Sequence, residues 1–67
     1  MKKIFEDFGI EVYTDGEKKY IRYDDGEIAA HYTIVEVSDN DAIQAQLSDK
    51  DAYNVIIKYQ NIEMGLL

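Results

Sequence analysis

The sequence predicts an α+β domain in which a three-stranded antiparallel β-meander packs against one long C-terminal helix preceded by a short helix, in the order β-β-β-α-α. Two Asp-Gly pairs between alternating apolar runs indicate the meander. Two Ser-x-x-Asp segments before helically spaced apolar residues indicate the helices. The chain, residues 1–67, has the length of a single small domain and shows no internal linker.

Both turns of the meander are Asp-Gly pairs, Asp15-Gly16 and Asp25-Gly26. A type I′ hairpin turn needs positive φ at both central residues, which aspartate tolerates and glycine adopts freely. Counting outward from two-residue loops pairs Ile21 with Ile10 in the first hairpin and with Ala30 in the second. The turns therefore predict three strands, near residues 8–14, 18–24 and 28–37.

The predicted register sorts the side chains of the sheet into two faces. One face is apolar and should pack on the long helix; it holds Phe8, Ile10, Val12, Ile21, Tyr23, Ile28, Ala30, Tyr32 and Ile34. The other face is mixed and holds Glu11, Tyr13, Lys18, Tyr20, Arg22, Ala29, His31 and Thr33. This sorting follows from the turn positions alone, so it supports the register.

Two helix starts follow the strands, one at Ser38 and one at Ser48. A serine oxygen at this position accepts from a free backbone N–H, and the acids that follow lie near the positive end of the helix dipole. A short helix is predicted near 39–47 and a longer one near 49–63. Residues at i, i+3, i+4 and i+7 spacing give the longer helix an apolar stripe, formed by Ala52, Val55, Ile56, Tyr59 and Ile62.

No residue pattern in the sequence indicates catalysis or metal binding. The chain has no cysteine and a single histidine, His31, so thiolate and histidine-rich metal sites are excluded. The run Asp39-Asn40-Asp41 lacks the glycine and the remaining ligands of a calcium-binding EF-hand loop. We therefore expect a protein that is not an enzyme and needs no cofactor.

The expected location is the cytoplasm. No apolar stretch approaches the roughly 20 residues of a membrane helix. The N-terminus places Glu6 and Asp7 where a secretory signal peptide needs an apolar run. The absence of cysteine fits a reducing compartment. We therefore expect no membrane partner.

The charge of the chain is strongly negative and uneven. Asp and Glu number 14 against 7 Lys and Arg, which gives a net charge of −7. No Lys or Arg lies between Tyr23 and Asp49. Such a chain repels phosphate backbones and attracts basic surfaces, so we do not expect nucleic acid as its partner.

The charge predicts a non-catalytic binding protein that inhibits a basic, nucleic-acid-binding protein by charge mimicry. Immunity proteins, antitoxins and phage-encoded anti-defence or anti-CRISPR inhibitors are of this class. The acids expected to meet the partner are Asp24, Asp25, Glu27, Glu36, Asp39, Asp41, Asp49 and Asp51. A simpler explanation stays open, since turns, helix caps and solubility also favour acidic residues.

Six tyrosines in a short chain suggest a second kind of contact. Tyrosine is enriched at protein interfaces, although aromatic residues are also favoured in β-strands whether or not a partner binds. The residues expected to bind a partner on the mixed sheet face are Glu11, Tyr13, Tyr20, Arg22 and His31. An aromatic sheet face can also stack single-stranded bases, but the net charge argues against that function.

Self-association is the main alternative. The long helix is apolar over more than one stripe, and a domain of this size buries only a thin core. The residues expected to pack on a second copy in a homodimer are Tyr53, Ile57, Met64, Leu66 and Leu67.

Overall fold

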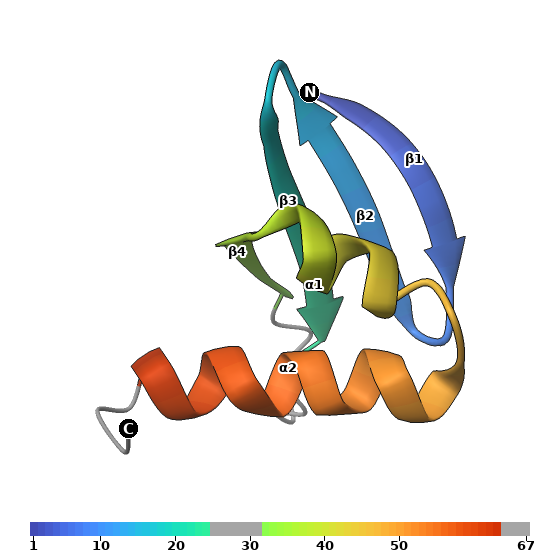
Figure 1. Cartoon of the computed structure of the whole chain (residues 1–67), viewed down its shortest axis with the longest axis vertical. Coiled ribbons are helices and arrows are strands. Elements are labelled where there is room, and N and C mark those ends of the chain that lie inside the picture. Colours follow the sequence, from blue (N-terminus) through green and yellow to red (C-terminus); the bar gives the residue numbers. More distant parts are fainter. Residues whose placement is uncertain (25–31, 64–67) are drawn as a thin grey trace.

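The described part of the chain folds into four strands followed by two helices. A computed structural model describes residues 1–24 and 32–63, the last two of these by their backbone only (Figure 1). Its elements are β1 Lys2–Asp7, β2 Ile10–Asp15, β3 Lys18–Asp24, β4 Tyr32–Val37, α1 Asp39–Gln44 and α2 Asp49–Glu63. The strands form one antiparallel sheet in the order β1-β2-β3-β4. The α+β meander is confirmed, but the sheet has four strands and not three.

The additional strand is β1, which pairs with β2 across a turn formed by Phe8 and Gly9. Both turn residues have positive φ, 53° at Phe8 and 77° at Gly9, as a type I′ turn requires. The backbone N–H of Phe8 donates to the Asp7 carboxylate at 2.8 Å and stabilises the turn. The predicted strand 8–14 therefore begins too early, because phenylalanine so rarely adopts positive φ that a sequence pattern does not suggest it.

The hairpin of β2 and β3 turns one residue later than predicted. Its loop is formed by Gly16 and Glu17, and Gly16 has a φ of 65°. Ile21 consequently pairs with Val12 and not with Ile10. Each partner moves by an even number of residues, so the side chains of β2 and β3 keep their predicted faces.

The predicted antiparallel pairing of β3 with β4 is confirmed, but its predicted register is wrong, and the error reverses the faces of β4. Ile21 pairs with Val35 and not with Ala30, an odd shift that moves every side chain to the opposite face. Tyr32 and Ile34, both predicted in the core, are 60% and 52% exposed on the other side. A two-residue connection does not agree with this pairing, and the second Asp-Gly pair lies outside the described residues.

Both predicted helix starts are confirmed by their caps. Ser38 Oγ accepts from the backbone N–H of Asp41, and Ser48 Oγ accepts from that of Asp51, each at 3.1 Å. These bonds satisfy N–H groups that no helical carbonyl can reach. The short helix α1 ends at Gln44 rather than near residue 47, whereas α2 spans the predicted range.

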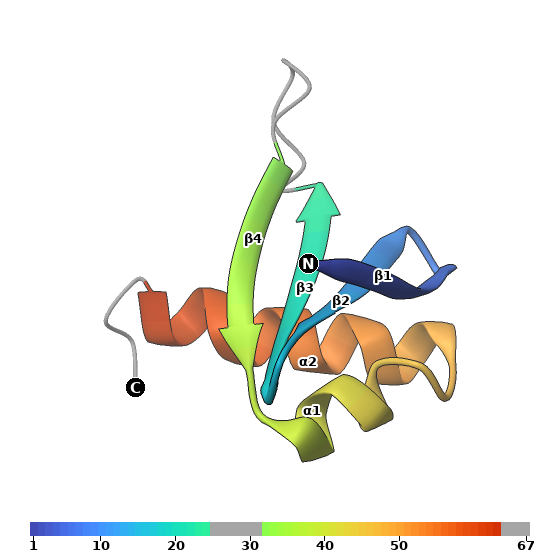
Figure 2. The same cartoon turned by 90° about the horizontal axis from the view of Figure 1, so that it is seen from above.

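The helices and the sheet form two layers, with α2 running across one face of the sheet (Figure 1, Figure 2). The core between the layers is formed by Ile10, Val12, Ile21, Tyr23, Val37, Ala42, Ala45, Ala52 and Val55. Because the helices contribute mainly alanine, the sheet supplies most of the buried side-chain volume. In the part of the chain that the structure describes, no helix is both long and apolar enough to cross a membrane.

Candidate functional site

The face of the sheet opposite the core, here called the open face, is the candidate interaction surface. Strand alternation assigns to it Lys3, Glu6, Glu11, Tyr13, Asp15, Lys18, Tyr20, Arg22, Asp24, Tyr32, Ile34 and Glu36. Four of the five residues expected to bind on the mixed face are in this set. The fifth, His31, lies outside the described residues.

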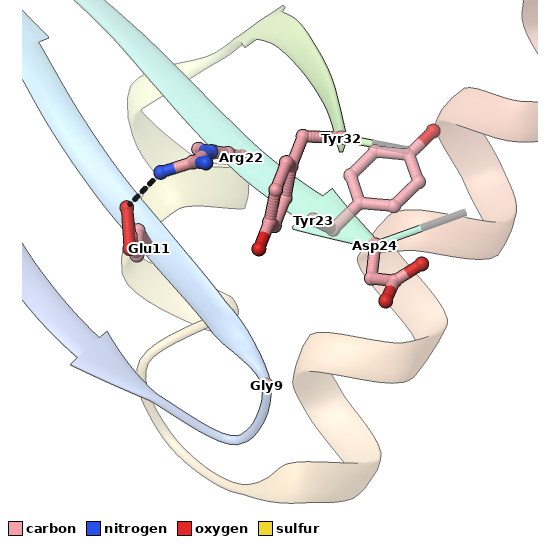
Figure 3. Close-up of a pocket in the computed structure, with 6 residues that line it drawn as sticks. All are labelled: Gly9, Glu11, Arg22, Tyr23, Asp24 and Tyr32. Atoms are coloured by element: carbon pink, nitrogen blue, oxygen red, sulfur yellow. Dashed lines mark hydrogen bonds and ion pairs between the residues drawn. The ribbon is translucent and has the colours of Figure 1, made fainter. Parts of the chain in front are cut away.

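An ion pair and two tyrosines order the centre of the open face. Arg22 Nη1 donates to Glu11 Oε1 at 3.1 Å (Figure 3). The hydroxyl of Tyr13 donates to the same carboxylate oxygen. The guanidinium carbon of Arg22 lies 3.8 Å from the centroid of the Tyr32 ring, a cation–π contact. These contacts join side chains of β2, β3 and β4, so this part of the surface is preorganised.

The carboxyl of Glu11 has a lowered pKa. The hydrogen bond from Tyr13 is the largest cause; desolvation opposes it, and the hydrogen bond and charge of Arg22 add to it. Glu11 is therefore an anion at neutral pH, and its charge cancels that of Arg22. The centre of the open face consequently presents hydrogen-bonding groups and an aromatic ring without a net charge.

Replacing Tyr13 by phenylalanine should raise the pKa of Glu11 toward its ordinary value of 4.5, because the main hydrogen bond to the carboxylate is lost. An NMR titration of the Glu11 side-chain carboxyl measures the change. Tyr20→Phe is the matched control, since Tyr20 lies opposite Tyr13 on β3 and is not among the described hydrogen-bond partners of Glu11. Equal shifts in the two variants would contradict the assigned role of Tyr13.

A shallow pocket lies beside this network, between β2, β3 and β4 (Figure 3). It is lined by Gly9, Glu11, Arg22, Tyr23, Asp24 and Tyr32. Its cavity volume is about 50 Å³. Sites that enclose a small molecule usually measure about 300–1,000 Å³. The pocket therefore suits a single side chain of a protein partner better than a free ligand.

The acids predicted from the sequence to bind a basic partner lie in different parts of the structure. Asp24 and Glu36 are exposed on the open face and lie opposite Tyr32 and Tyr20 respectively. Glu36 pairs with Tyr20, which lies four residues before Asp24 on β3, so the two acids are separated by about 13 Å along the strand direction. Asp39 follows at the start of α1, where it forms an ion pair with Lys19 at 3.5 Å. Residues 25 and 27, the nominated Asp25 and Glu27, lie outside the described residues.

The remaining three acids lie on the helices, away from the open face. Asp41 is buried at 7% exposure and accepts hydrogen bonds from other parts of the chain. The Asp51 carboxylate accepts from Ser48 Oγ at 2.9 Å within the cap of α2. Asp49 is exposed in the first turn of α2. The six described acids therefore form no single cluster, and Asp41 and Asp51 have structural partners.

Tyr32 and Ile34, the two exposed hydrophobic residues of β4, were not predicted from the sequence to bind a partner. Their segment, Tyr-Thr-Ile-Val-Glu-Val, has apolar residues at both odd and even positions, so alternation does not choose a face. The only available indication was the length of the connection before β4, which sets the register. In the predicted self-association set, Tyr53 is 63% exposed and Ile57 half-buried, and Met64, Leu66 and Leu67 lie outside the described residues.

Among the residues that the structure describes, no three His, Cys, Asp or Glu side chains gather as metal ligands would. Comparisons with protein-family models, with curated proteins and with solved structures found no match. The open face is therefore the feature of the described chain from which a function can be inferred.

Proposed function

We propose that this chain is a small, acidic, non-catalytic binding protein that inhibits a basic, nucleic-acid-binding protein by occupying its cationic surface. Proteins of this kind include immunity proteins, antitoxins and anti-CRISPR-type inhibitors that imitate the charge of nucleic acid. The observation that most supports the proposal is the composition of the open face. Exposed Tyr32 and Ile34 lie there between two exposed acids, Asp24 and Glu36.

The two kinds of side chain have different parts in the proposed complex. Tyrosine and large aliphatic residues at the centre of an interface supply most of the binding free energy once water is excluded. Acids around them mainly raise the association rate with a cationic partner and select against anionic ones. Because Glu11 neutralises Arg22, the centre of the face does not repel a basic surface.

The net negative charge of the chain also favours attraction of a basic partner. Four ion pairs in the described residues engage Lys3, Lys19, Arg22 and Lys58. They use four of the seven cations in the chain, and each cation also neutralises one acid. The remaining acids therefore outnumber the remaining cations by the full net charge of −7. A field of this sign steers a basic protein toward the chain at low ionic strength.

The test is capture of the partner from a lysate of the source organism on the immobilised chain, followed by affinity measurements with the purified partner. Tyr32→Ala should weaken binding by roughly 10- to 30-fold, as removal of a central interface tyrosine does. Binding should also weaken steeply as salt concentration rises. Titration calorimetry at several salt concentrations measures both effects.

Tyr53→Ala is the matched control, because Tyr53 is as exposed as Tyr32 but lies on α2. It should leave the affinity unchanged. A partner that binds independently of salt, or one that loses equal affinity with both variants, would exclude the proposed open-face mechanism.

Self-association through α2 is a second candidate, favoured by the exposure of Tyr53. It predicts a dimer that Tyr53→Lys dissociates, and sedimentation analysis tests it. Single-stranded nucleic-acid binding stays a weaker proposal, because the Arg22 charge that would meet a phosphate is already paired with Glu11. A gel shift that Tyr20→Ala abolishes would support it.

A further inference from the structure

The two edges of the sheet differ in how they discourage further strand pairing. The edge strand β1 carries Lys2 and Lys3, and its pairing with β2 shifts register between Lys3 and Phe5. Lysines and bulges are the common means by which proteins prevent an edge from accepting another strand. The opposite edge, β4, pairs regularly with β3 along its whole length and contains no lysine, arginine or proline.

Strand β4 therefore has an outer edge that, among the described residues, neither a basic side chain nor a bulge protects. It pairs with β3 on one side, and no described strand pairs with it on the other. Its outward backbone N–H and C=O groups are consequently available to another strand. Its side chains suit a sheet interior, since four of the six are β-branched, namely Thr33, Ile34, Val35 and Val37.

We infer that β4 pairs in antiparallel orientation with β4 of a second copy of this chain. A two-fold axis perpendicular to the sheet at Ile34 places the two Ile34 residues opposite each other. Thr33 then lies opposite Val35 of the second copy, and Tyr32 lies opposite Glu36. This register keeps open-face residues beside open-face residues and core-face residues beside core-face residues, as the pleat of a continuous sheet requires.

Local charge complementarity favours a second copy of this chain as the partner of the outer edge of β4. The Glu36 carboxylate makes no ion pair with the described residues of its own chain. Across the axis it meets Tyr32, whose ring holds the Arg22 guanidinium at 3.8 Å. Glu11 is bonded to one guanidinium nitrogen of Arg22, and a guanidinium has further N–H donors. Each acid thus lies near hydrogen-bond donors of the other copy, and the symmetry forms this contact twice. The paired Ile34 side chains cover each other at the centre.

The inferred dimer has a distinctive dependence on salt. Each copy has a net charge of −7, so the two copies repel one another at long range. Raising the ionic strength from about 0.01 M to about 0.15 M shortens the Debye length from about 30 Å to about 8 Å. The dimer should therefore strengthen with salt, whereas binding to a basic partner should weaken.

Analytical ultracentrifugation of the full chain over a concentration series tests the inference. The wild-type chain should show a dimer whose dissociation constant falls as salt rises. Ile34→Lys should raise that constant by about tenfold or more, because two lysines then face each other on the axis. Glu36→Lys should weaken the dimer as well, because it places a cation near Arg22 of the other copy.

Tyr53→Lys is the matched control, since it changes the charge equally at another exposed site, on α2. It should leave the dimer intact, and circular dichroism verifies that every variant folds. A wild-type chain that stays monomeric up to about 1 mM overturns the inference. So does a dimer that Tyr53→Lys dissociates and Ile34→Lys does not. Because only this chain is present, failure here is separable from failure to bind a basic partner.

Discussion

Replacing Ile21 by alanine should lower the free energy of unfolding by about 2–5 kcal/mol, the usual cost of removing a large buried aliphatic side chain. Ile21 is 1% exposed, and it lies between Val12 and Val35 at the centre of the sheet. A domain of this length has a total stability of about 3–10 kcal/mol. The substitution should therefore leave a substantial fraction of the chain unfolded, which urea denaturation followed by circular dichroism measures.

Ile43→Ala provides the control with the same chemical change. Ile43 is exposed on α1, so its truncation creates no cavity and alanine suits a helix. Its effect should stay within about 0.5 kcal/mol. Similar losses for the two variants would show that the small core does not depend on Ile21 as the structure indicates.

Replacing Asp41 by asparagine should destabilise the fold by about 1–3 kcal/mol. Asp41 Oδ2 accepts from Lys58 Nζ at 2.9 Å and from the Tyr59 hydroxyl at 2.7 Å. The Tyr59 hydroxyl in turn accepts from the backbone N–H of Ser38 at 3.2 Å. These bonds connect the start of α1 to α2. Lys58 is half exposed, which lowers the cost below that of a fully buried ion pair.

The stability contributed by Asp41 should depend on pH. Burial raises the pKa of Asp41, but hydrogen bonds from Tyr59, Lys58 and Ser38 together outweigh burial, so the folded pKa lies below the ordinary 3.8. A lowered pKa gives stability that is present above the unfolded value and is lost as pH falls through the folded value. The difference between wild type and Asp41→Asn should therefore shrink on acidification below about pH 4.

Asp39→Asn is the control for both measurements. Asp39 lies in the same first turn of α1, so both variants lose the favourable interaction with the helix dipole. The Asp39 side chain is largely exposed, and its ion pair with Lys19 is longer, at 3.5 Å. Denaturation at several pH values compares the two. If Asp39→Asn costs as much as Asp41→Asn, the buried network is not the cause.

Asp41 also illustrates why part of the candidate site could not be predicted from the sequence. Its position after Ser38 predicted the cap correctly, because a cap depends on residues a few positions apart. Its partner Lys58 lies 17 residues further along the chain. Only the packing of α1 against α2 brings them together. Asp41 was therefore predicted to bind a partner only because the chain is rich in acidic residues.

The assignment of side chains to the two sheet faces likewise succeeded where it depended on nearby residues and failed where it depended on a longer connection. The side chains of β2 and β3 were assigned to the correct faces, although the loop was misplaced by one residue, because the even shift preserves the pleat. The β4 assignment depended on a connection whose length the sequence pattern misjudged. Tyr32 and Ile34 thereby moved from the predicted core to the open face, where the proposed function now depends on them.

The order of the strands has a consequence for how the chain acquires its structure. Every strand in the described sheet pairs with its neighbour along the chain, so the sheet closes only short loops. Low contact order of this kind allows rapid folding. The chain also contains no proline, which removes prolyl isomerisation as a slow step. We therefore expect a newly synthesised molecule to spend little time partly folded, so that the exposed edge of an incomplete sheet has little opportunity to aggregate.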